Sequence, residues 1–392
     1  MPSVRLHWGL ITGEYPPAPG GVADYTAQLA RALAAEGDNV HVWAPAPAAA
    51  EGDGVVVHPL PGRFGRNARR RLLKELRGME TRPRLLLQYV PHAFGRKAMN
   101  LGFTRWFGRR RDWQPWVMFH EVAFPLETGQ AARHRFLAHI TRRMAAQVQH
   151  AAAASFVSIP AWAELLEELA PGGPPGQWLP VPSNLPVAPA PEAIAAARRE
   201  LSPSPDAQLL ATFGAFSEHT RSCLEHLLPG LLASDSRRTA VLIGPGSHAA
   251  AATLLRRAPA LGPRLRATGF LEPADAATYL AACELAIQPY PDGVSGRRGT
   301  AMAALALALP LVTCQGRLTE SVWPESRAVA LAVTGKDPVE QAAALAPLVE
   351  DVLRQEARRR SLAEAGQRLY RERFSMDHTV RRLRAAACEV QA

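Results

Sequence analysis

Both halves of the chain alternate short apolar runs with helical segments, and this alternation restricts the fold more than any single motif. In the first half, an apolar run at 4–11 precedes a Pro/Gly-rich loop, an amphipathic helical pattern at 22–36 and a second apolar run at 40–44. A strand, a glycine-rich turn, a helix and a parallel strand open doubly wound α/β domains, in which ligands bind beyond the carboxyl ends of the strands. The second half begins again with an apolar run at 209–213 and then Gly214. We therefore predict an α/β protein with two facing Rossmann-like domains and a cleft between them.

The length of the chain also favours two domains. It has 392 residues, whereas single domains typically have about 100–200 residues. A proline-rich stretch at 177–191 has the composition of an extended linker. We predict an N-terminal domain at 1–183, a C-terminal domain at 184–372 and a final helix at 373–392 that packs back on the N-terminal domain.

The strongly basic charge favours anionic partners. The net charge is +10 and the sequence isoelectric point is about 10.1, which suits nucleic acid, phosphorylated substrates or an anionic membrane surface. Part of this excess reflects an arginine-, alanine- and proline-rich composition. The sequence has no nucleic-acid recognition motif, so we do not expect a nucleic-acid partner.

Cysteine usage and hydropathy predict a cytoplasmic protein. The four cysteines are widely separated and form no C-x-x-C pair, which is typical of reduced thiols. No apolar run reaches transmembrane length, and the N-terminus lacks the pattern of a signal peptide. Aromatic residues interleave with arginines at 103–116. This pattern is typical either of a peripheral contact with an anionic membrane, here its inner face, or of core aromatics beside surface arginines. No feature of the sequence indicates an oligomeric state.

An arginine pair in the second half is the clearest candidate for an anion site. The stretch at 288–314 reads as a strand end, a turn-rich loop, an apolar helix at 300–309 and a further strand. Arg297 and Arg298 precede this helix, with Gly296 and Gly299 on either side. Two guanidinium groups and the amides of a helix start suit a diphosphate, unless the arginines are simply exposed on a loop.

Polar groups and glycines also follow other predicted strands. His120 and Glu121 come directly after the run at 116–119, where α/β enzymes place working groups and where structural histidines also occur. Gly20 and Gly21 allow the backbone to approach a sugar phosphate or form a tight turn. Asp24, in the first turn of the next helix, either accepts hydrogen bonds from sugar hydroxyls or complements the helix dipole.

The chain resembles GT-B glycosyltransferases of family four, which mostly transfer sugars with retention from nucleotide-sugar donors. The resemblance spans nearly the whole sequence. It is carried by EYPPAPGGVADYT near the start, the strand-end FHE, the turn GAFSEHTR, the segment ATGFLEPADAATYLAACELAIQPY and the helix RRGTAMAALALALPLVT. It implies a GT-B fold with the active site in the interdomain cleft.

The resemblance also implies roles for residues of this chain. The candidate catalytic residues are His120, which would contact the donor sugar, and Arg221 and Arg298, which would hold the phosphates. Asp24 and Tyr25 are the acceptor-binding candidates. The donor-binding candidates are Gly20, Gly21, Gly214, Phe270, Leu271, Ser295, Gly296, Arg297, Gly299 and Thr300. We expect a UDP- or GDP-sugar as substrate, a sugar-containing acceptor, no cofactor and no metal, since no Asp-x-Asp motif occurs.

The sequence departs from the family at one important place. The family usually carries two glutamates separated by seven residues, and Ser295 and Ala303 stand at those positions here. The chain instead resembles a subgroup with S-x-R-R-G-T before the same helix. Arg297 and Arg298 then take over part of the donor grip. The alternative reading is a homologue that binds a nucleotide sugar without transferring it.

Overall fold

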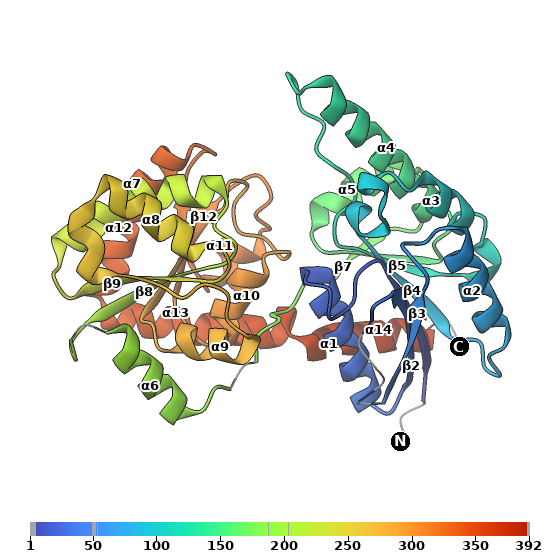
Figure 1. The fold of residues 1–392 in the computed structure, drawn as a ribbon, viewed down its shortest axis with the longest axis horizontal. Coiled ribbons are helices and arrows are strands. Elements are labelled where there is room, and N and C mark those ends of the chain that lie inside the picture. Colours follow the sequence, from blue (N-terminus) through green and yellow to red (C-terminus); the bar gives the residue numbers. More distant parts are fainter. Residues whose placement is uncertain (1–4, 49–51, 53, 187, 203, 390–392) are drawn as a thin grey trace. The chain divides into compact units, whose positions relative to one another are not determined.

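The computed structural model describes residues 5–48, 52, 54–186, 188–202 and 204–389. The chain divides into two compact units (Figure 1). Unit 1 comprises residues 1–181 and 376–392, and unit 2 comprises residues 182–375. The chain therefore leaves unit 1 once and returns to it for its final helix.

A parallel sheet forms the centre of unit 1. Its strand order is β3-β2-β1-β4-β5-β6-β7 in the described residues, and all pairings are parallel. The order 3-2-1-4-5-6 is that of a Rossmann sheet, in which the topological switch point lies between the first and fourth strands. The strands are β1 (His7–Thr12), β2 (Asn39–Pro45), β3 (Val55–Leu60), β4 (Arg84–Tyr89), β5 (Trp116–Phe119), β6 (Ala154–Val157) and β7 (Gly176–Trp178).

Helices cover both faces of this sheet because the strands carry apolar side chains on both sides. Side chains from α1 and α14 share one core cluster with β1, β2 and β5. Side chains from α2, α3 and α4 share the other cluster. The helices are α1 (Gly21–Ala35), α2 (Arg66–Arg77), α3 (Leu101–Phe107), α4 (Ala132–Gln149), α5 (Pro160–Leu169) and α14 (Met376–Glu389), with short 3₁₀ turns η1 (Pro91–Phe94), η2 (Arg96–Ala98) and η3 (Arg111–Trp113).

The last helix is fixed to unit 1 by charge as well as by packing. Val380 and Leu383 of α14 are buried in the same cluster as α1, and Figure 1 shows the two helices side by side. Arg384 forms an ion pair with Asp38. The Asp38 carboxylate also accepts hydrogen bonds from Leu6 N at 3.0 Å and Trp8 Nε1 at 2.9 Å. The buried carboxylate is thus compensated from three sides, as a buried charge requires.

Unit 2 repeats the same sheet order. Its described strands lie in the order β10-β9-β8-β11-β12-β13, again with parallel pairings. Its switch point lies between β8 and β11. The strands are β8 (Gln208–Phe213), β9 (Arg238–Ile243), β10 (Leu265–Ala267), β11 (Leu285–Gln288), β12 (Leu311–Gln315) and β13 (Ala330–Val333). Two sheets of this kind confirm the predicted α/β class and its Rossmann-like domains.

The helices of unit 2 begin at residues that suit helix starts. Ser217 caps α7 by accepting a hydrogen bond from Thr220 N at 3.2 Å. Asp337 caps α12 by accepting from Val339 N and Glu340 N, with Pro338 at the first helical position. The helices are α6 (Pro191–Leu201), α7 (Glu218–Ser234), α8 (Ser247–Arg257), α9 (Pro273–Ala281), α10 (Gly299–Ala306), α11 (Val322–Ser326), α12 (Pro338–Arg354) and α13 (Glu356–Leu369), with the shorter turns η4 (Pro259–Arg264) and η5 (Tyr370–Phe374).

Candidate functional site

Three of the predicted donor residues of unit 2, Gly214, Arg298 and Thr300, lie at its switch point. β8 and β11 are paired through Leu210 and Leu285, and Gln288 Nε2 donates a hydrogen bond to Phe213 O at 3.0 Å. Gly214 follows β8 with a φ of 141°. A Cβ built on it would lie 3.4 Å from Thr300 Cγ2. The turn after β8 and the start of α10 therefore lie side by side at the carboxyl edge of the sheet.

Arg298 is held at the start of α10 by an aromatic ring. Its guanidinium carbon lies 4.8 Å from the centroid of the Tyr290 ring. The Tyr290 hydroxyl is 2.6 Å from Thr300 Oγ1, and Tyr290 O accepts a hydrogen bond from Gln341 Nε2 at 3.0 Å. Burial raises the pKa of Tyr290 to about 12, so the ring remains neutral. The cation–π contact fixes the guanidinium while leaving its donors available for an anion.

Two polar atoms of this segment are buried and unsatisfied. Arg298 Nε and Ser295 Oγ have no hydrogen-bond partner among the described residues, and the Ser295 side chain is fully buried. Buried polar atoms are nearly always hydrogen-bonded in folded proteins. Their lack of protein partners is consistent with a site that a ligand completes.

Glu320 secures the turn that carries Arg297, and sequence reasoning missed it. Its Oε1 accepts a hydrogen bond from Gly296 N at 2.8 Å, and its Oε2 accepts one from Trp323 Nε1, also at 2.8 Å. Burial raises the pKa of this carboxyl, while these hydrogen bonds and the charge of Arg297 oppose the rise. The Gly296 amide is consequently engaged within the protein. The one available signal was the position of Glu320 shortly after the strand β12.

Arg221 lies in the first turn of α7, which follows the Gly214 turn. Its side chain is half-buried and makes no hydrogen bond or ion pair with another described residue. No interaction among these residues joins it to Arg298. Arg221 thus adds a separate positive charge at the carboxyl edge, beside a helix N-terminus that also favours anions.

Phe270 and Leu271 follow β10, which lies two strands from β8 in the sheet. Adjacent strands are about 4.8 Å apart, so this loop begins roughly 10 Å from the Gly214 turn. Gly244 N donates to Gly269 O at 3.1 Å, and Gly269 N donates to Ser247 Oγ at 2.8 Å. Phe270 is 67% exposed. The backbone here is ordered by the loop after β9, while the aromatic ring faces solvent.

In unit 1 the glycine pair heads α1. Gly20 is the N-cap of this helix, and a Cβ on it would lie 2.3 Å from Glu14 Oε2. A Cβ on Gly21 would meet nothing within 4 Å. Glu14 also forms an ion pair with His92 at 3.2 Å, which raises the pKa of His92 against the effect of its partial burial. A side chain on Gly20 would therefore displace the Glu14 carboxylate, whereas Gly21 leaves its backbone open to a ligand.

His120 is buried at the end of β5 and is neutral. Its exposure is 7%, and burial lowers its pKa to about 3. His120 Nε2 lies 2.8 Å from Gln88 Oε1, and an amide oxygen only accepts. The ring therefore carries its proton on Nε2 and presents Nδ1 as an acceptor. Ser158 Oγ anchors the backbone by donating to His120 O at 2.8 Å.

Tyr25 contacts His120 directly. The two rings are 4.7 Å apart in a T-shaped arrangement. The Tyr25 hydroxyl and Gln88 Nε2 are buried without a hydrogen-bond partner among the described residues. Asp24 precedes Tyr25 in the first turn of α1 and is half-buried. The structure thus brings together Tyr25, His120 and Gln88, of which the sequence did not indicate Gln88.

The described part of the chain has neither a metal-binding cluster nor a helix suited to cross a membrane. No group of three or more His, Cys, Asp or Glu side chains there is placed to hold a metal ion. No helix in the same residues combines the length and apolar character needed to cross a bilayer.

Solved glycosyltransferases share this architecture over their whole length. Sucrose-phosphate synthase from Thermosynechococcus elongatus superimposes with a TM-score of 0.72 at 18% identity, covering 98% of this chain and 99% of that chain. HepE from Anabaena, in complex with UDP and glucose, gives 0.65 at 16% identity over 98% and 100%. The catalytic domain of starch synthase IV from Arabidopsis thaliana, bound to ADP and acarbose, gives 0.63 at 14% identity over 93% and 95%.

At these identities the likeness establishes the fold. The chain has the GT-B fold of two Rossmann-like units, as predicted. No protein-family model matches the chain, and no curated protein sequence matches it.

Proposed function

We propose that the protein is a glycosyltransferase that moves a sugar, with retention, from a nucleoside diphosphate sugar to a sugar-containing acceptor. One observation carries the proposal. The Gly214 turn, Arg298 and the start of α10 converge at the switch point of unit 2, where ligands of doubly wound sheets bind. Solved structures of the same fold include complexes with UDP, UDP-glucose and ADP, which supports a nucleotide sugar as the ligand.

The chemistry requires stabilisation of the leaving group. When the bond between the anomeric carbon and the diphosphate breaks, its electrons move to the diphosphate and the sugar becomes oxocarbenium-like. Arg298 and Arg297, with the amides at the start of α10, are suited to the charge that develops on the phosphates. Arg221 adds a further cation from α7. Preorganised charges of this kind can lower a barrier by about 3–4 kcal/mol for a single donor.

His120 suits a role in binding rather than proton transfer. A group with a pKa of about 3 stays neutral at physiological pH, so Nδ1 acts as an acceptor for a sugar hydroxyl. The unsatisfied Tyr25 hydroxyl beside it supplies a donor or a second acceptor. With Asp24, these groups make the carboxyl edge of unit 1 the sugar-facing side in our proposal, and unit 2 the nucleotide-binding side.

The first test is thermal stabilisation by a panel of UDP, GDP, ADP and their sugar conjugates. We expect one nucleotide to raise the melting temperature of the wild-type protein and to lose this effect in Arg297→Ala/Arg298→Ala. The matched control is Arg199→Ala/Arg256→Ala, which removes the same charge from exposed positions at the ends of α6 and α8. If no nucleotide stabilises the wild type, the donor site and the transferase proposal both fail.

Binding alone does not establish transfer. Release of the nucleoside diphosphate from the identified donor, with and without candidate acceptors, separates a transferase from a binding homologue. We expect turnover to survive chelation of divalent metals because protein cations face the phosphates in our proposal. Stabilisation without any turnover across a broad acceptor panel would favour the non-catalytic alternative.

A further inference from the structure

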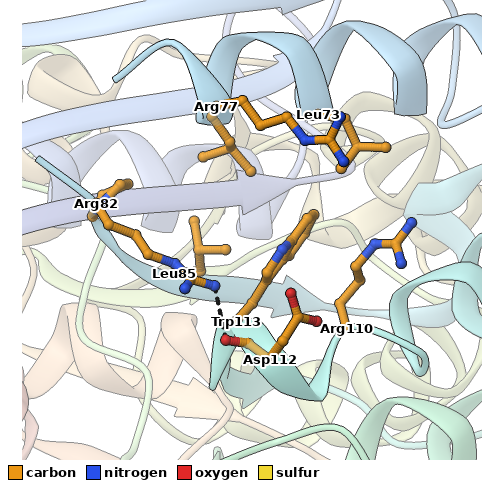
Figure 2. A pocket seen from close by; sticks show the side chains of 9 residues that line it. Leu73, Arg77, Arg82, Leu85, Arg110, Asp112 and Trp113 are labelled. Carbon is orange, nitrogen blue, oxygen red and sulfur yellow. Dashed lines mark hydrogen bonds between the residues drawn. The ribbon is translucent and has the colours of Figure 1, made fainter. Parts of the chain in front are cut away.

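A hollow in unit 1 lies outside the candidate functional site described above. It encloses about 370 Å³ and combines three arginines with an apolar floor (Figure 2). Its lining residues are Leu73, Leu76, Arg77, Arg82, Pro83, Leu85, Arg110, Asp112 and Trp113.

The hollow is at the amino edge of the sheet, opposite the candidate sugar-facing side of unit 1. Arg82 and Pro83 directly precede β4, and Trp113 precedes β5. Gln88 and His120 lie at the other ends of these two strands. A six-residue strand such as β4 spans roughly 20 Å. The hollow is therefore a separate site and does not take part in the proposed transfer.

Two of its arginines are held in place before any ligand binds. Arg110 packs over two indoles, with its guanidinium carbon 5.2 Å from the Trp106 centroid and 5.6 Å from the Trp113 centroid. Its Nε is buried with no hydrogen-bond partner among the described residues. Arg82 Nη2 donates to Asp112 O at 2.9 Å. Figure 2 shows Arg82, Arg110 and Asp112 around the Trp113 indole.

Arg77 completes the positive rim. It lies in the last turn of α2, where a cation complements the helix dipole. The dipole of α2 explains the presence of Arg77 but not that of Arg82 and Arg110, which lie outside this helix.

A second hollow adjoins the first and increases the charge imbalance. It encloses about 250 Å³, shares Arg82, Pro83, Asp112 and Trp113 with the first, and adds Arg5 and Arg84. The described lining of the two hollows thus contains Arg5, Arg77, Arg82, Arg84 and Arg110 against the single carboxylate of Asp112. Burial lowers the pKa of Arg84, whose guanidinium carbon lies 4.6 Å from the centroid of the Trp116 ring. An anion would relieve this excess of like charge.

We propose that the hollow binds an amphiphilic organophosphate. The phosphate engages Arg77, Arg82 and Arg110, since guanidinium groups bind phosphate oxygens through paired hydrogen bonds. A short apolar part packs on Leu73, Leu76 and the Trp113 ring. Such a ligand has two sources, a small phosphorylated metabolite with an apolar group or the headgroup region of an anionic phospholipid. This site is independent of the proposed glycosyl transfer.

The test compares three probes on the full chain: inorganic phosphate, dihexanoylphosphatidic acid, and phosphatidylcholine vesicles with or without phosphatidylglycerol. Calorimetry measures the soluble probes and sedimentation measures the vesicles. We expect dihexanoylphosphatidic acid to bind more tightly than inorganic phosphate. Arg77→Gln/Arg110→Gln should weaken this binding by about tenfold or more, because each lost charged hydrogen bond costs on the order of tenfold in affinity.

The matched control is Arg66→Gln/Arg70→Gln, which removes two exposed charges from the same helix outside both hollows. If the wild type sediments with phosphatidylglycerol vesicles and only Arg77→Gln/Arg110→Gln loses this binding, the ligand is a phospholipid. If dihexanoylphosphatidic acid binds but the vesicles do not, the ligand is a small phosphorylated metabolite. Equal loss in both double variants means that net charge alone attracts the anion and overturns the proposal, as does no binding of any probe. Nucleotide stabilisation should be the same in both variants, so this failure is distinguishable from failure of the transferase proposal.

Discussion

At the scale of single residues, Glu320 explains how the turn that carries Arg297 and Arg298 keeps its shape. Its two oxygens join Gly296 N to Trp323 Nε1. Trp323 is fully buried and stacks on Phe374 at 5.3 Å. The Glu320 carboxylate, on the loop after β12, thus links the backbone beside Arg297 to a buried tryptophan of unit 2.

Replacing this carboxylate should weaken nucleotide binding. In Glu320→Gln one accepted hydrogen bond is lost or distorted and the charge that faces Arg297 is removed. We expect a loss of about 1–3 kcal/mol in the stability of unit 2 and a several-fold increase in the dissociation constant of the nucleotide. Calorimetry and urea unfolding measure the two effects. Glu325→Gln, which neutralises an exposed carboxylate in the neighbouring helix α11, should change neither. Unchanged nucleotide affinity in Glu320→Gln would refute the positioning role.

No sequence pattern predicted this contact. Arg297, Arg298 and Gly299 were recognisable because they are adjacent in the chain and precede a helix. Glu320 approaches Gly296 only through the parallel pairing of β11 with β12. Gln88 is similar, since the interior of a strand gives no sign that its side chain will meet a histidine from the next strand. Tertiary pairing supplies both residues.

At the scale of the elements, a substitution at the start of α10 should affect stability and ligand binding in different ways. A Cβ on Gly299 would meet nothing within 4 Å, and its φ is not in the left-handed region. Alanine is a better helix former than glycine, so Gly299→Ala should leave the stability unchanged or raise it by up to about 1 kcal/mol.

The same substitution should weaken donor binding. If the diphosphate contacts the amides at the start of α10, the new methyl group occupies the space that the phosphates need. We expect an affinity loss of about tenfold or more for the stabilising nucleotide, measured by calorimetry beside thermal unfolding. Gly230→Ala, at an exposed and equally open position within α7, controls for the general effect of the substitution on a helix. Full affinity in Gly299→Ala would show that the diphosphate does not approach this backbone.

The elements themselves were predicted best where start signals were strong. The helix α5 (Pro160–Leu169) begins with proline at its first position, a start signal that the sequence itself carries. The strand β7 (Gly176–Trp178) overlaps the linker predicted at 177–191, because three half-buried residues between prolines and glycines carry no alternating pattern. The helix α3 (Leu101–Phe107) was missed as well. Its aromatic residues interleave with arginines and reduce the helical signal, but Phe103 and Phe107 are buried in the core of unit 1.

At the scale of the whole molecule, both sheets follow the order that alternating strands and helices predict. Connections in such sheets are short and right-handed, so repeating β/α units leave few alternative topologies. The return of the chain at residue 376 to build α14 into unit 1 depends instead on particular long-range contacts, including the ion pair between Arg384 and Asp38. The alternation of strands and helices therefore predicts the parallel sheets. The attachment of α14 to unit 1 depends instead on particular buried side chains, which the alternation does not predict.

The two units should lose stability in different ranges of pH. Burial lowers the pKa of His120 in unit 1 to about 3, while the unfolded chain titrates near 6.5. Below pH 6.5 His120 is protonated in the unfolded state but not in the native state. The free energy of unfolding of unit 1 therefore falls as the pH decreases from 6.5 towards 3, by up to about 1.4 kcal/mol per pH unit. His92 has a raised pKa, so its stabilising contribution is already fully present below pH 6.5. Burial lowers the pKa of His41, also in unit 1, and His41 therefore adds to the loss. In unit 2, hydrogen bonds to Arg237 and Arg238 lower the pKa of Asp235 and of Glu350 to about 2. Their contribution is lost only below their ordinary values near 4.

The distribution of tryptophan and cysteine makes this prediction measurable on the intact chain. Seven of the eight tryptophans lie in unit 1 and only Trp323 lies in unit 2, whereas the buried Cys223, Cys283 and Cys314 all lie in unit 2. Between pH 6.5 and 5, the urea midpoint from tryptophan emission should fall while the midpoint from thiol labelling with dithiodipyridine stays constant. In His120→Gln the pH slope of the tryptophan midpoint should decrease, because the contribution of His120 is removed and only the smaller contribution of the partly exposed His41 remains. An identical slope in this variant and the wild type would mean that His120 is protonated in the native state, and its proposed role as a neutral acceptor for the donor sugar would then fail.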